Sequence, residues 1–168
     1  DELRMKYWYR YGATLLGLLR HHGTNPHHFL HHTHHFENIE QLVVFDRALL
    51  AHLRHLPGRR YLFSNAPREY VDALLRVTGL GRVLHGSLSI EDLGFHPKPH
   101  KQAYQTALRR LGVSARRCIM VEDTVDNLRE AKRLGMRTVW ISQAHTRPAW
   151  VDQRLASVRL LRHPAHLP

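Results

Sequence analysis

The stretch IMVEDTVDN, from Ile119 to Asn127, joins a short apolar run to two adjacent carboxylates. Such a run, bounded by a polar turn, is typical of a buried parallel strand, and the residues that follow have a helical pattern. Glu122 and Asp123 would then lie at the carboxyl end of the strand, where open α/β sheets bind ligands. Because adjacent carboxylates repel each other, a hard cation such as Mg²⁺ is a suitable partner. The alternative is that Asp123 or Thr124 simply caps the helix.

A second junction of this kind lies in RYLFSNAPREYVDALLRVTGL, residues 60–80. Ser64 and Asn65 follow a short apolar strand, and Pro67 is expected to open the next helix. A hydroxyl group and free backbone N–H groups at such a junction can hold a phosphate oxygen. A plain Ser/Asn helix cap explains the same residues equally well.

A third stretch, GFHPKPHKQAYQTALRRLG, places Lys98 between two prolines just before a predicted helix. The prolines restrict the backbone and aim the lysine at the loop-to-helix junction. Lysine is also scarce in this chain, with four lysines against twenty-one arginines. The competing interpretation is an ordinary solvated loop lysine.

In this order, the three stretches resemble the motifs of the haloacid dehalogenase (HAD) superfamily of phosphohydrolases. Ser64 matches the second motif, Lys98 the third, and Glu122 with Asp123 the fourth. The chain is more closely similar to the pyrimidine 5′-nucleotidase-like branch. That likeness rests on YRYGATLLGLLRHHG, on HTHHFENI and on LPGRRYLFSNAPREYVDALL.

The resemblance implies an α/β fold, with a Rossmann-like core of parallel sheet (57–168) and a small helical cap (1–56). It implies a phosphatase that hydrolyses a small phosphomonoester, such as a pyrimidine nucleoside 5′-monophosphate, through an aspartyl-phosphate. Asp123, helped by Glu122, would coordinate Mg²⁺. Lys98 and Ser64 would be catalytic, and the substrate-binding residues would be Ser64, Asn65, Lys98 and, from the cap, His34.

The first motif of the superfamily, a strand ending in Asp-x-Asp, is missing from this sequence. The stretch most similar to this motif is LVVFDRALL, residues 42–50, but Asp46 in it is expected to cap a helix instead. Removing a central strand would leave a gap of roughly 10 Å between the strands of Ser64 and Asp123. Because the chain begins at Asp1 within a helical pattern, we expect that the nucleophile strand precedes it in the native protein and that this chain is inactive. The rarer alternative is a catalytically dead homologue.

Composition leaves two rival functions open. The net charge of +11 favours anionic partners, yet the arginines are scattered and no basic stripe carries interleaved aromatics, as in single-strand binders. A nucleic-acid-binding protein is therefore the weaker rival, and a non-catalytic module that binds a phosphorylated ligand is the other. No apolar run is long enough for a membrane span. The single cysteine, Cys118, fits a reducing, cytoplasmic location. The oligomeric state stays open.

Half of the sixteen histidines fall between His21 and His35. Several pairs, such as His27/His31 and His31/His35, have the i, i+4 spacing that places both rings on one helical face. Such pairs can bind zinc, but no neighbouring residue before Glu37 completes a ligand set. The main alternative is a polar helix with solvated histidines. His34 and His35 are also candidates for contact with the substrate.

Residues 1–56 are expected to be helical, and the remainder to alternate between strand and helix. Strands are predicted near 60–64, 83–86, 117–121 and 137–141. Helices are predicted near 67–78, 100–111 and 125–134. The tail, with Pro148, Pro164 and Pro168, is expected to form a short edge strand and a terminal turn.

Overall fold

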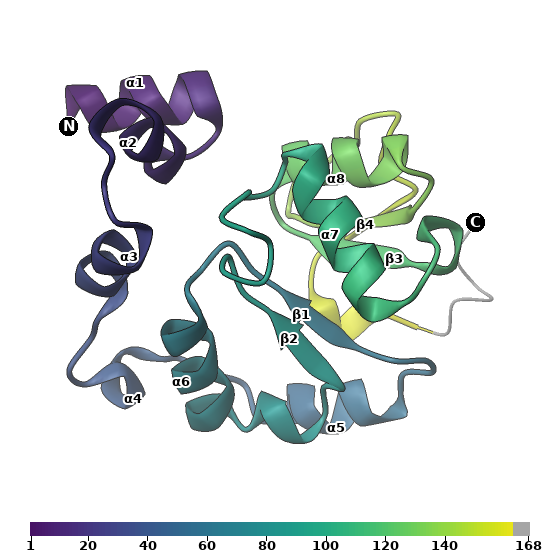
Figure 1. Ribbon diagram of the computed structural model, residues 1–168. Helices are drawn as coiled ribbons and strands as arrows, with labels where there is room; N and C mark the ends of the chain where they lie inside the picture. Colours follow the sequence, from purple (N-terminus) through teal and green to yellow (C-terminus); the bar gives the residue numbers. More distant parts are fainter. Residues whose placement is uncertain (163–168) are drawn as a thin grey trace.

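A computed structural model describes residues 1–162, and its second half alternates between strands and helices (Figure 1). The strands are β1 (Tyr61–Phe63), β2 (Gly86–Leu88), β3 (Ile119–Glu122), β4 (Arg137–Ile141) and β5 (Gln153–Leu155). The helices of this half are α6 (Arg68–Thr78), α7 (Lys101–Leu111) and α8 (Val125–Arg133), with 3₁₀ turns η1 (Leu80–Arg82), η2 (Ala115–Arg117) and η3 (Val158–Leu160). The predicted α/β class is confirmed.

Within residues 1–162 all strand pairs are parallel, and they form two sheets. β1 pairs with β2, with Phe63 opposite Leu88, and the second sheet has the order β3-β4-β5. Within residues 1–162, no hydrogen-bonded ladder joins β1 to β3. This separation agrees with the gap expected between the strands of Ser64 and Asp123, and the strand that would fill it stays a prediction.

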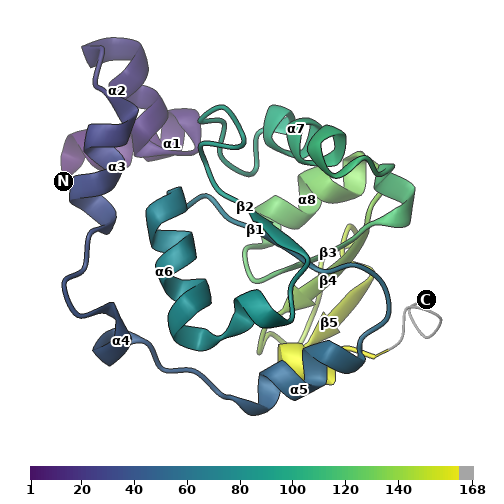
Figure 2. The same ribbon diagram turned by 60° about the horizontal axis from the view of Figure 1, so that its bottom comes forward.

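The hydrophobic core joins the two sheets through α7 and α8. α8 packs on β3 and β4, as Figure 2 shows. The fully buried Tyr104 of α7 donates its hydroxyl hydrogen to the backbone carbonyl of Asn127 at 2.7 Å. The same ring meets Phe63 of β1 edge-on, with ring centroids 5.4 Å apart. Tyr104 therefore connects β1 to the helix that follows β3.

The first third of the chain is helical, as expected. Its helices are α1 (Glu2–Tyr11), α2 (Thr14–His22), α3 (Pro26–His34), α4 (Ile39–Leu42) and α5 (Ala48–His55). The helical pattern at residues 3–19 is interrupted at Gly12, whose φ of 75° is left-handed and ends α1. α2 then folds back against α1, and Gly17 lies so close to Tyr7 that a Cβ atom there would be 2.1 Å from the ring.

The structure shifts one predicted strand and contains another as predicted. The strand predicted at 83–86 is wrong in position: η1 occupies 80–82, and the N–H of Leu84 still donates to the carbonyl of Leu80. Pairing with β1 therefore begins only at Gly86. The predicted edge strand in the tail is confirmed as β5, whereas Pro164 and Pro168 lie outside the described residues.

No helix within residues 1–162 has both the length and the apolar character that crossing a lipid bilayer requires.

Candidate active site

Lys98 contacts both sheets. Its side chain is 9% exposed, and its Nζ atom donates to Glu122 Oε2 at 2.6 Å and to the carbonyl of Phe63 at 2.9 Å. Phe63 ends β1 and Glu122 ends β3, so one ammonium group links the carboxyl ends of both strands. The ring of Phe63 adds a cation–π contact, with Nζ 5.0 Å from the ring centroid.

The loop that carries Lys98 is held by Asn65. The Asn65 side chain accepts from the Lys98 N–H at 2.8 Å and donates to the Lys98 carbonyl at 3.0 Å. This pairing of a side-chain amide with a peptide group positions the loop against the end of β1. The Lys98–Pro99 peptide bond is cis. On the far side of Pro99, the ring of His100 hydrogen-bonds the carbonyl of Tyr11 at 2.5 Å, which brings the end of α1 to this loop.

Both oxygens of Glu122 are occupied by donors. Oε2 accepts from Lys98 Nζ and, at 3.1 Å, from the side-chain amide of the buried Asn127. Oε1 accepts from the backbone N–H groups of Asp123 at 3.1 Å and Thr124 at 3.2 Å. Glu122 therefore positions Lys98 directly, and it would have to exchange hydrogen bonds in order to coordinate a metal ion.

Asp123 is the more open carboxylate of the pair. Its side chain is exposed, while its backbone carbonyl accepts from Trp140 Nε1 at 2.9 Å. A side-chain interaction with Glu122, supported by backbone N–H groups and the charge of Lys98, keeps the pKa of Asp123 below its ordinary value against the opposing effect of partial burial. An ionised, accessible carboxylate oxygen is a ligand that Mg²⁺ prefers. Asp123 thus fits the magnesium ion that the sequence resemblance implies.

Ser64 follows β1 and lies half-buried beside Asn65. Its hydroxyl oxygen accepts from the N–H of Ala66 at 3.1 Å within the turn before α6. The helix itself has Pro67 as its N-cap and no side-chain cap hydrogen bond, so the Ser/Asn cap considered as an alternative is not formed. Its hydroxyl hydrogen remains available to a ligand oxygen. Helix α6 begins at Arg68, one residue later than predicted, and the N–H of Arg68 is taken by both carboxylate oxygens of Glu91 at 3.0 and 2.9 Å.

His34 lies apart from these residues. It sits on α3, where its ring meets Tyr70 of α6 with centroids 5.7 Å apart. It lines a hollow of about 640 Å³ whose walls come from α3, the start of α6 and the segment after β2. Ser64, Lys98 and Asp123 are not among the residues that line this hollow.

Asp46 lies at the start of α5, close to the predicted position, but the N-cap residue of that helix is Arg47 rather than Asp46. Its Oδ1 atom accepts from the N–H of Ala48 at 2.9 Å, and its Oδ2 atom forms an ion pair with Arg159 at 2.9 Å. The apolar residues before it form no strand, and Val44 is fully exposed. The first motif of the resembling superfamily requires an aspartate at the end of a strand. Asp46 has no strand before it and so does not meet this requirement.

Sequence reasoning missed one contact that holds Lys98 in place and one that holds Asp123. The carbonyl of Phe63 and the side chain of Trp140 carry no motif, and their contribution depends on the ends of β1 and β4 meeting the loops of Lys98 and Asp123. The position of Asn65 beside Ser64 was the one available signal. That signal identified Asn65 as a site residue, but it did not show that Asn65 binds the Lys98 peptide group.

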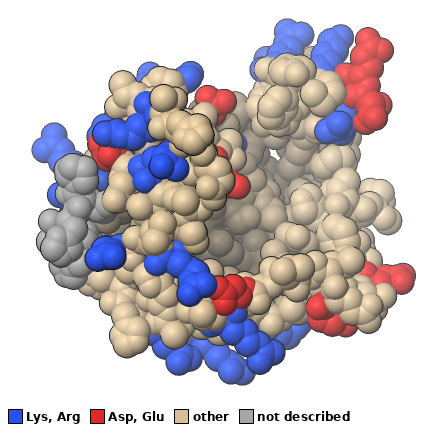
Figure 3. All heavy atoms as spheres, turned by 180° about the vertical axis from the view of Figure 1, so that it is seen from behind, with Lys and Arg blue, Asp and Glu red and all other residues tan. Residues whose placement is uncertain are grey.

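Positive charge is dispersed on the face seen in Figure 3. Lysine and arginine side chains lie there in separate groups, interrupted by acidic residues, around a hollow with mostly uncharged walls. This distribution provides no continuous basic track on that face.

Comparison with known proteins reveals one family. The model of the family described as "haloacid dehalogenase-like hydrolase" matches residues 7–135. (S)-2-haloacid dehalogenase 4A of Burkholderia cepacia is 34% identical over 89 residues, which cover 53% of this chain and 38% of that protein. Validoxylamine A 7′-phosphate phosphatase of Streptomyces hygroscopicus subsp. limoneus is 27% identical over 112 residues, which cover 66% of this chain and 52% of that protein. The chain thus spans about half the length, or less, of these curated relatives.

Solved structures show the same fold. A dehalogenase crystal structure aligns with a TM-score of 0.61 and 23% identity, over 93% of this chain and 76% of that one. CbbY from Rhodobacter sphaeroides, in complex with phosphate, aligns with a TM-score of 0.58 and 26% identity, over 71% of this chain and 56% of that one. The predicted Rossmann-like arrangement is confirmed by these neighbours.

Proposed function

Because this chain belongs to the haloacid dehalogenase-like hydrolases, we propose that the complete protein is a Mg²⁺-dependent phosphatase acting on a small phosphomonoester. One observation carries the proposal: a buried lysine, Lys98, is held between the carboxyl ends of two parallel strands, beside the ionised Asp123. Fixed charges at such a position favour phosphoryl transfer, in which catalysis is largely positioning and electrostatic stabilisation.

Each residue has a distinct part in this proposal. Lys98 neutralises phosphate charge, and the Ser64 hydroxyl donates to a phosphate oxygen. Asn65 keeps the Lys98 loop in place and supplies polar contact to the substrate. Asp123 would hold Mg²⁺, with Glu122 in support, and the ion would supply positive charge to the phosphate oxygens.

The proposed reaction passes through an aspartyl-phosphate and so needs a nucleophilic carboxylate beside Lys98. In residues 1–162, the carboxylate that Lys98 Nζ hydrogen-bonds is that of Glu122, whose oxygens already accept four hydrogen bonds. We therefore expect the 168-residue chain to bind Mg²⁺ but to release no phosphate from a phosphomonoester. A malachite-green assay with p-nitrophenyl phosphate and excess Mg²⁺ tests this, and steady turnover would contradict it.

A pyrimidine nucleoside 5′-monophosphate is the substrate we propose within this class. The proposal rests on the three sequence stretches similar to pyrimidine 5′-nucleotidases, and a relative that is itself a phosphatase supports the wider class. Residues 1–56 would form a cap and residues 57–168 the core. His34 would contribute to substrate contact from the cap.

The decisive experiment compares two neighbouring carboxylates in the complete protein. Asp123→Asn should lower kcat/KM for a phosphomonoester by about 10²-fold or more, because the proposed Mg²⁺ ligand is lost. Asp126→Asn is the matched control, since Asp126 lies in the first turn of α8 and its carboxylate forms a solvent-exposed ion pair with Arg129 at 3.6 Å. The measurement is phosphate release across a Mg²⁺ titration, with nucleoside monophosphates of both base classes.

Other outcomes would point to other functions. Chloride release from 2-chloropropionate, without phosphatase activity, would favour a dehalogenase such as the relative from Burkholderia cepacia. Tight binding of phosphorylated ligands without turnover by the complete protein would favour the non-catalytic module. Equal activity of the Asp123→Asn and Asp126→Asn variants would remove Asp123 from the site.

A further inference from the structure

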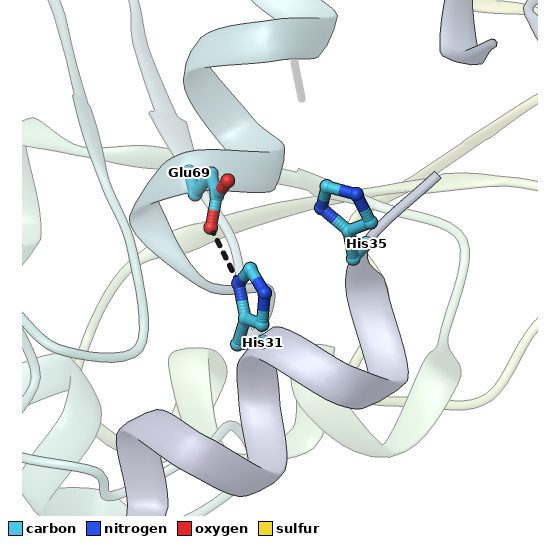
Figure 4. Close-up of side chains that lie close together, drawn as sticks. All are labelled: His31, His35 and Glu69. Carbon is cyan, nitrogen blue, oxygen red and sulfur yellow. Dashed lines mark hydrogen bonds and ion pairs between the residues drawn. The ribbon is translucent and has the colours of Figure 1, made fainter. Parts of the chain in front are cut away.

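His31 of α3 and His35, the C-cap residue of that helix, lie close to a carboxylate from α6. His31 and His35 are one helical turn apart, and Glu69 faces them from the first turn of α6, as Figure 4 shows. His31 Nδ1 lies 3.1 Å from Glu69 Oε2, and one ligand atom from each of the three side chains lies within 4.8 Å of the others. We propose that these residues bind a zinc-like divalent cation that joins α3 to α6.

The distances suit a small ion. Metal bonds of about 2.0–2.1 Å in a tetrahedral site place ligand atoms roughly 3.3 Å apart. The His31–Glu69 distance already meets this value, and side-chain rotation at an exposed site can bring His35 into range. Two imidazoles and one carboxylate are a known zinc ligand set that leaves a fourth position for water. Here that position would adjoin the 640 Å³ hollow, whose lining includes His31 and Glu69.

The ligand atoms select for borderline metals. Imidazole nitrogen favours Zn²⁺ and its neighbours in the first transition row, whereas Mg²⁺ prefers oxygen. The site is therefore chemically different from the Asp123 carboxylate. Its occupation would not depend on the proposed phosphatase function, which concerns other residues.

The surrounding charges do not oppose a cation. Arg68, next to Glu69 in sequence, is directed to Asp92 through a short ion pair and donates to Ser87 Oγ at 2.7 Å. Its positive charge is thus matched by Asp92. Glu69 has His31 as its partner, and the two side chains are 68% and 50% exposed. A polar contact this exposed contributes little to stability even between charged groups, so the three side chains would stabilise the packing of α3 against α6 mainly by holding a metal ion.

The same helix provides an internal control. His28 and His32 are also one turn apart, with ring centroids 4.4 Å from each other. Within residues 1–162, no carboxylate or thiol completes a three-ligand group around that pair. The proposal therefore predicts that two histidine pairs of equal spacing differ in zinc affinity because only one of them has Glu69.

Calorimetric titration of the 168-residue chain with ZnCl₂, in 10 mM MgCl₂, tests the site directly. Glu69→Gln and the double variant His31→Gln/His35→Gln should each weaken zinc binding by about 10-fold or more, since losing even a supporting group costs 10- to 100-fold. His28→Gln/His32→Gln should stay within about twofold of the parent. All proteins carry Cys118→Ser, which removes the single thiol, although burial already raises the pKa of that group.

Thermal unfolding gives a second, independent readout. At 100-fold excess over its dissociation constant, zinc should raise the Tm of the parent by about 5 °C or more and leave the Glu69→Gln Tm unchanged. Without zinc, the Tm of the Glu69→Gln variant should match the parent, which separates ligand loss from misfolding. Equal zinc affinity for the Glu69→Gln variant and the parent, or equal losses for both histidine pairs, would overturn the proposal.

Discussion

Lys98 and Glu122 form an ion pair in which each side chain is only 9% exposed, so water has little access to either group. Removing one partner of a buried pair leaves an uncompensated charge and typically costs about 3–5 kcal/mol. Lys98→Met should therefore lower the free energy of unfolding by an amount in this range. Urea denaturation of the 168-residue chain, followed by circular dichroism, measures it.

The double variant Lys98→Met/Glu122→Gln is the control for this prediction. It removes both charges and should recover much of the lost stability, because an apolar or neutral replacement of a buried pair is often nearly neutral. The single variant Glu122→Gln completes the comparison. If the loss of stability in the double variant equals the sum of the losses in Lys98→Met and Glu122→Gln, the two residues act independently.

Lys98 should also affect phosphatase activity directly, apart from its effect on the stability of the fold. In the complete protein, Lys98→Ala should lower turnover by about 10²-fold, because one preorganised charge disappears. Assays below the melting temperature of the variant, with folding checked by circular dichroism, separate this effect from unfolding. Near-normal turnover would show that Lys98 is an ordinary loop residue.

At the scale of elements, Asp152 ties α8 to the sheet at the start of β5. It accepts from the Thr138 N–H at 2.8 Å and hydroxyl at 3.1 Å, and it forms a short ion pair with Lys132. Burial acts to raise the pKa of Asp152, but the contacts with Lys132 and Thr138 outweigh it and lower that pKa. A carboxyl with a lowered folded-state pKa stabilises the fold above its unfolded pKa and loses this effect as pH falls through the folded value.

Asp152→Asn should therefore destabilise the chain at pH 7 by about 1–3 kcal/mol. The difference from the parent should shrink as the pH falls below about 4, where the parent carboxylate also becomes protonated. Urea midpoints measured from pH 7 to pH 3 provide the test, with the exposed Asp126→Asn as control. A difference that does not change with pH would assign the effect to packing alone.

The contact between α1 and α2 depends on Gly17. A methyl group there would overlap the ring of Tyr7, which is 6% exposed and has little room to move. Gly17→Ala should cost about 1–3 kcal/mol through overpacking and should speed hydrogen exchange in both helices. Gly81→Ala is the matched control, because its added Cβ meets nothing closer than 3.9 Å. Equal protection in the two variants would contradict close packing at Gly17.

At the scale of the whole molecule, the net charge of +11 raises the nucleic-acid alternative again. Dispersed charges are screened beyond about 8 Å at physiological ionic strength, so we expect binding to a labelled 30-nucleotide single strand at low salt to disappear by 0.15 M NaCl. Fluorescence anisotropy across a salt series checks this. Submicromolar affinity that persists at 0.15 M NaCl would restore nucleic-acid binding as a leading function.

The sequence by itself determined the local elements and the three junctions. Apolar runs such as that at Ile119 and helical periodicities such as that from Lys101 to Leu111 are properties of neighbouring residues, so they can be recognised without the fold. Parallel strands then carry their following residues to one edge of the sheet. For Ser64 and Asp123 this geometry predicts a shared edge, whereas the position of Lys98 beside the end of β3 was implied by the resemblance to the HAD superfamily.

Only the tertiary structure decided which side chains meet. The N–H groups of the turn and the side-chain amide of Asn127 fix the Glu122 carboxylate next to the Lys98 ammonium group. The Asp123 side chain is left exposed to solvent. Glu69 reaches His31 across 38 positions of sequence, and no local pattern connects them. Such contacts depend on the path of the chain between elements, which packing sets, and periodicity describes only one element at a time.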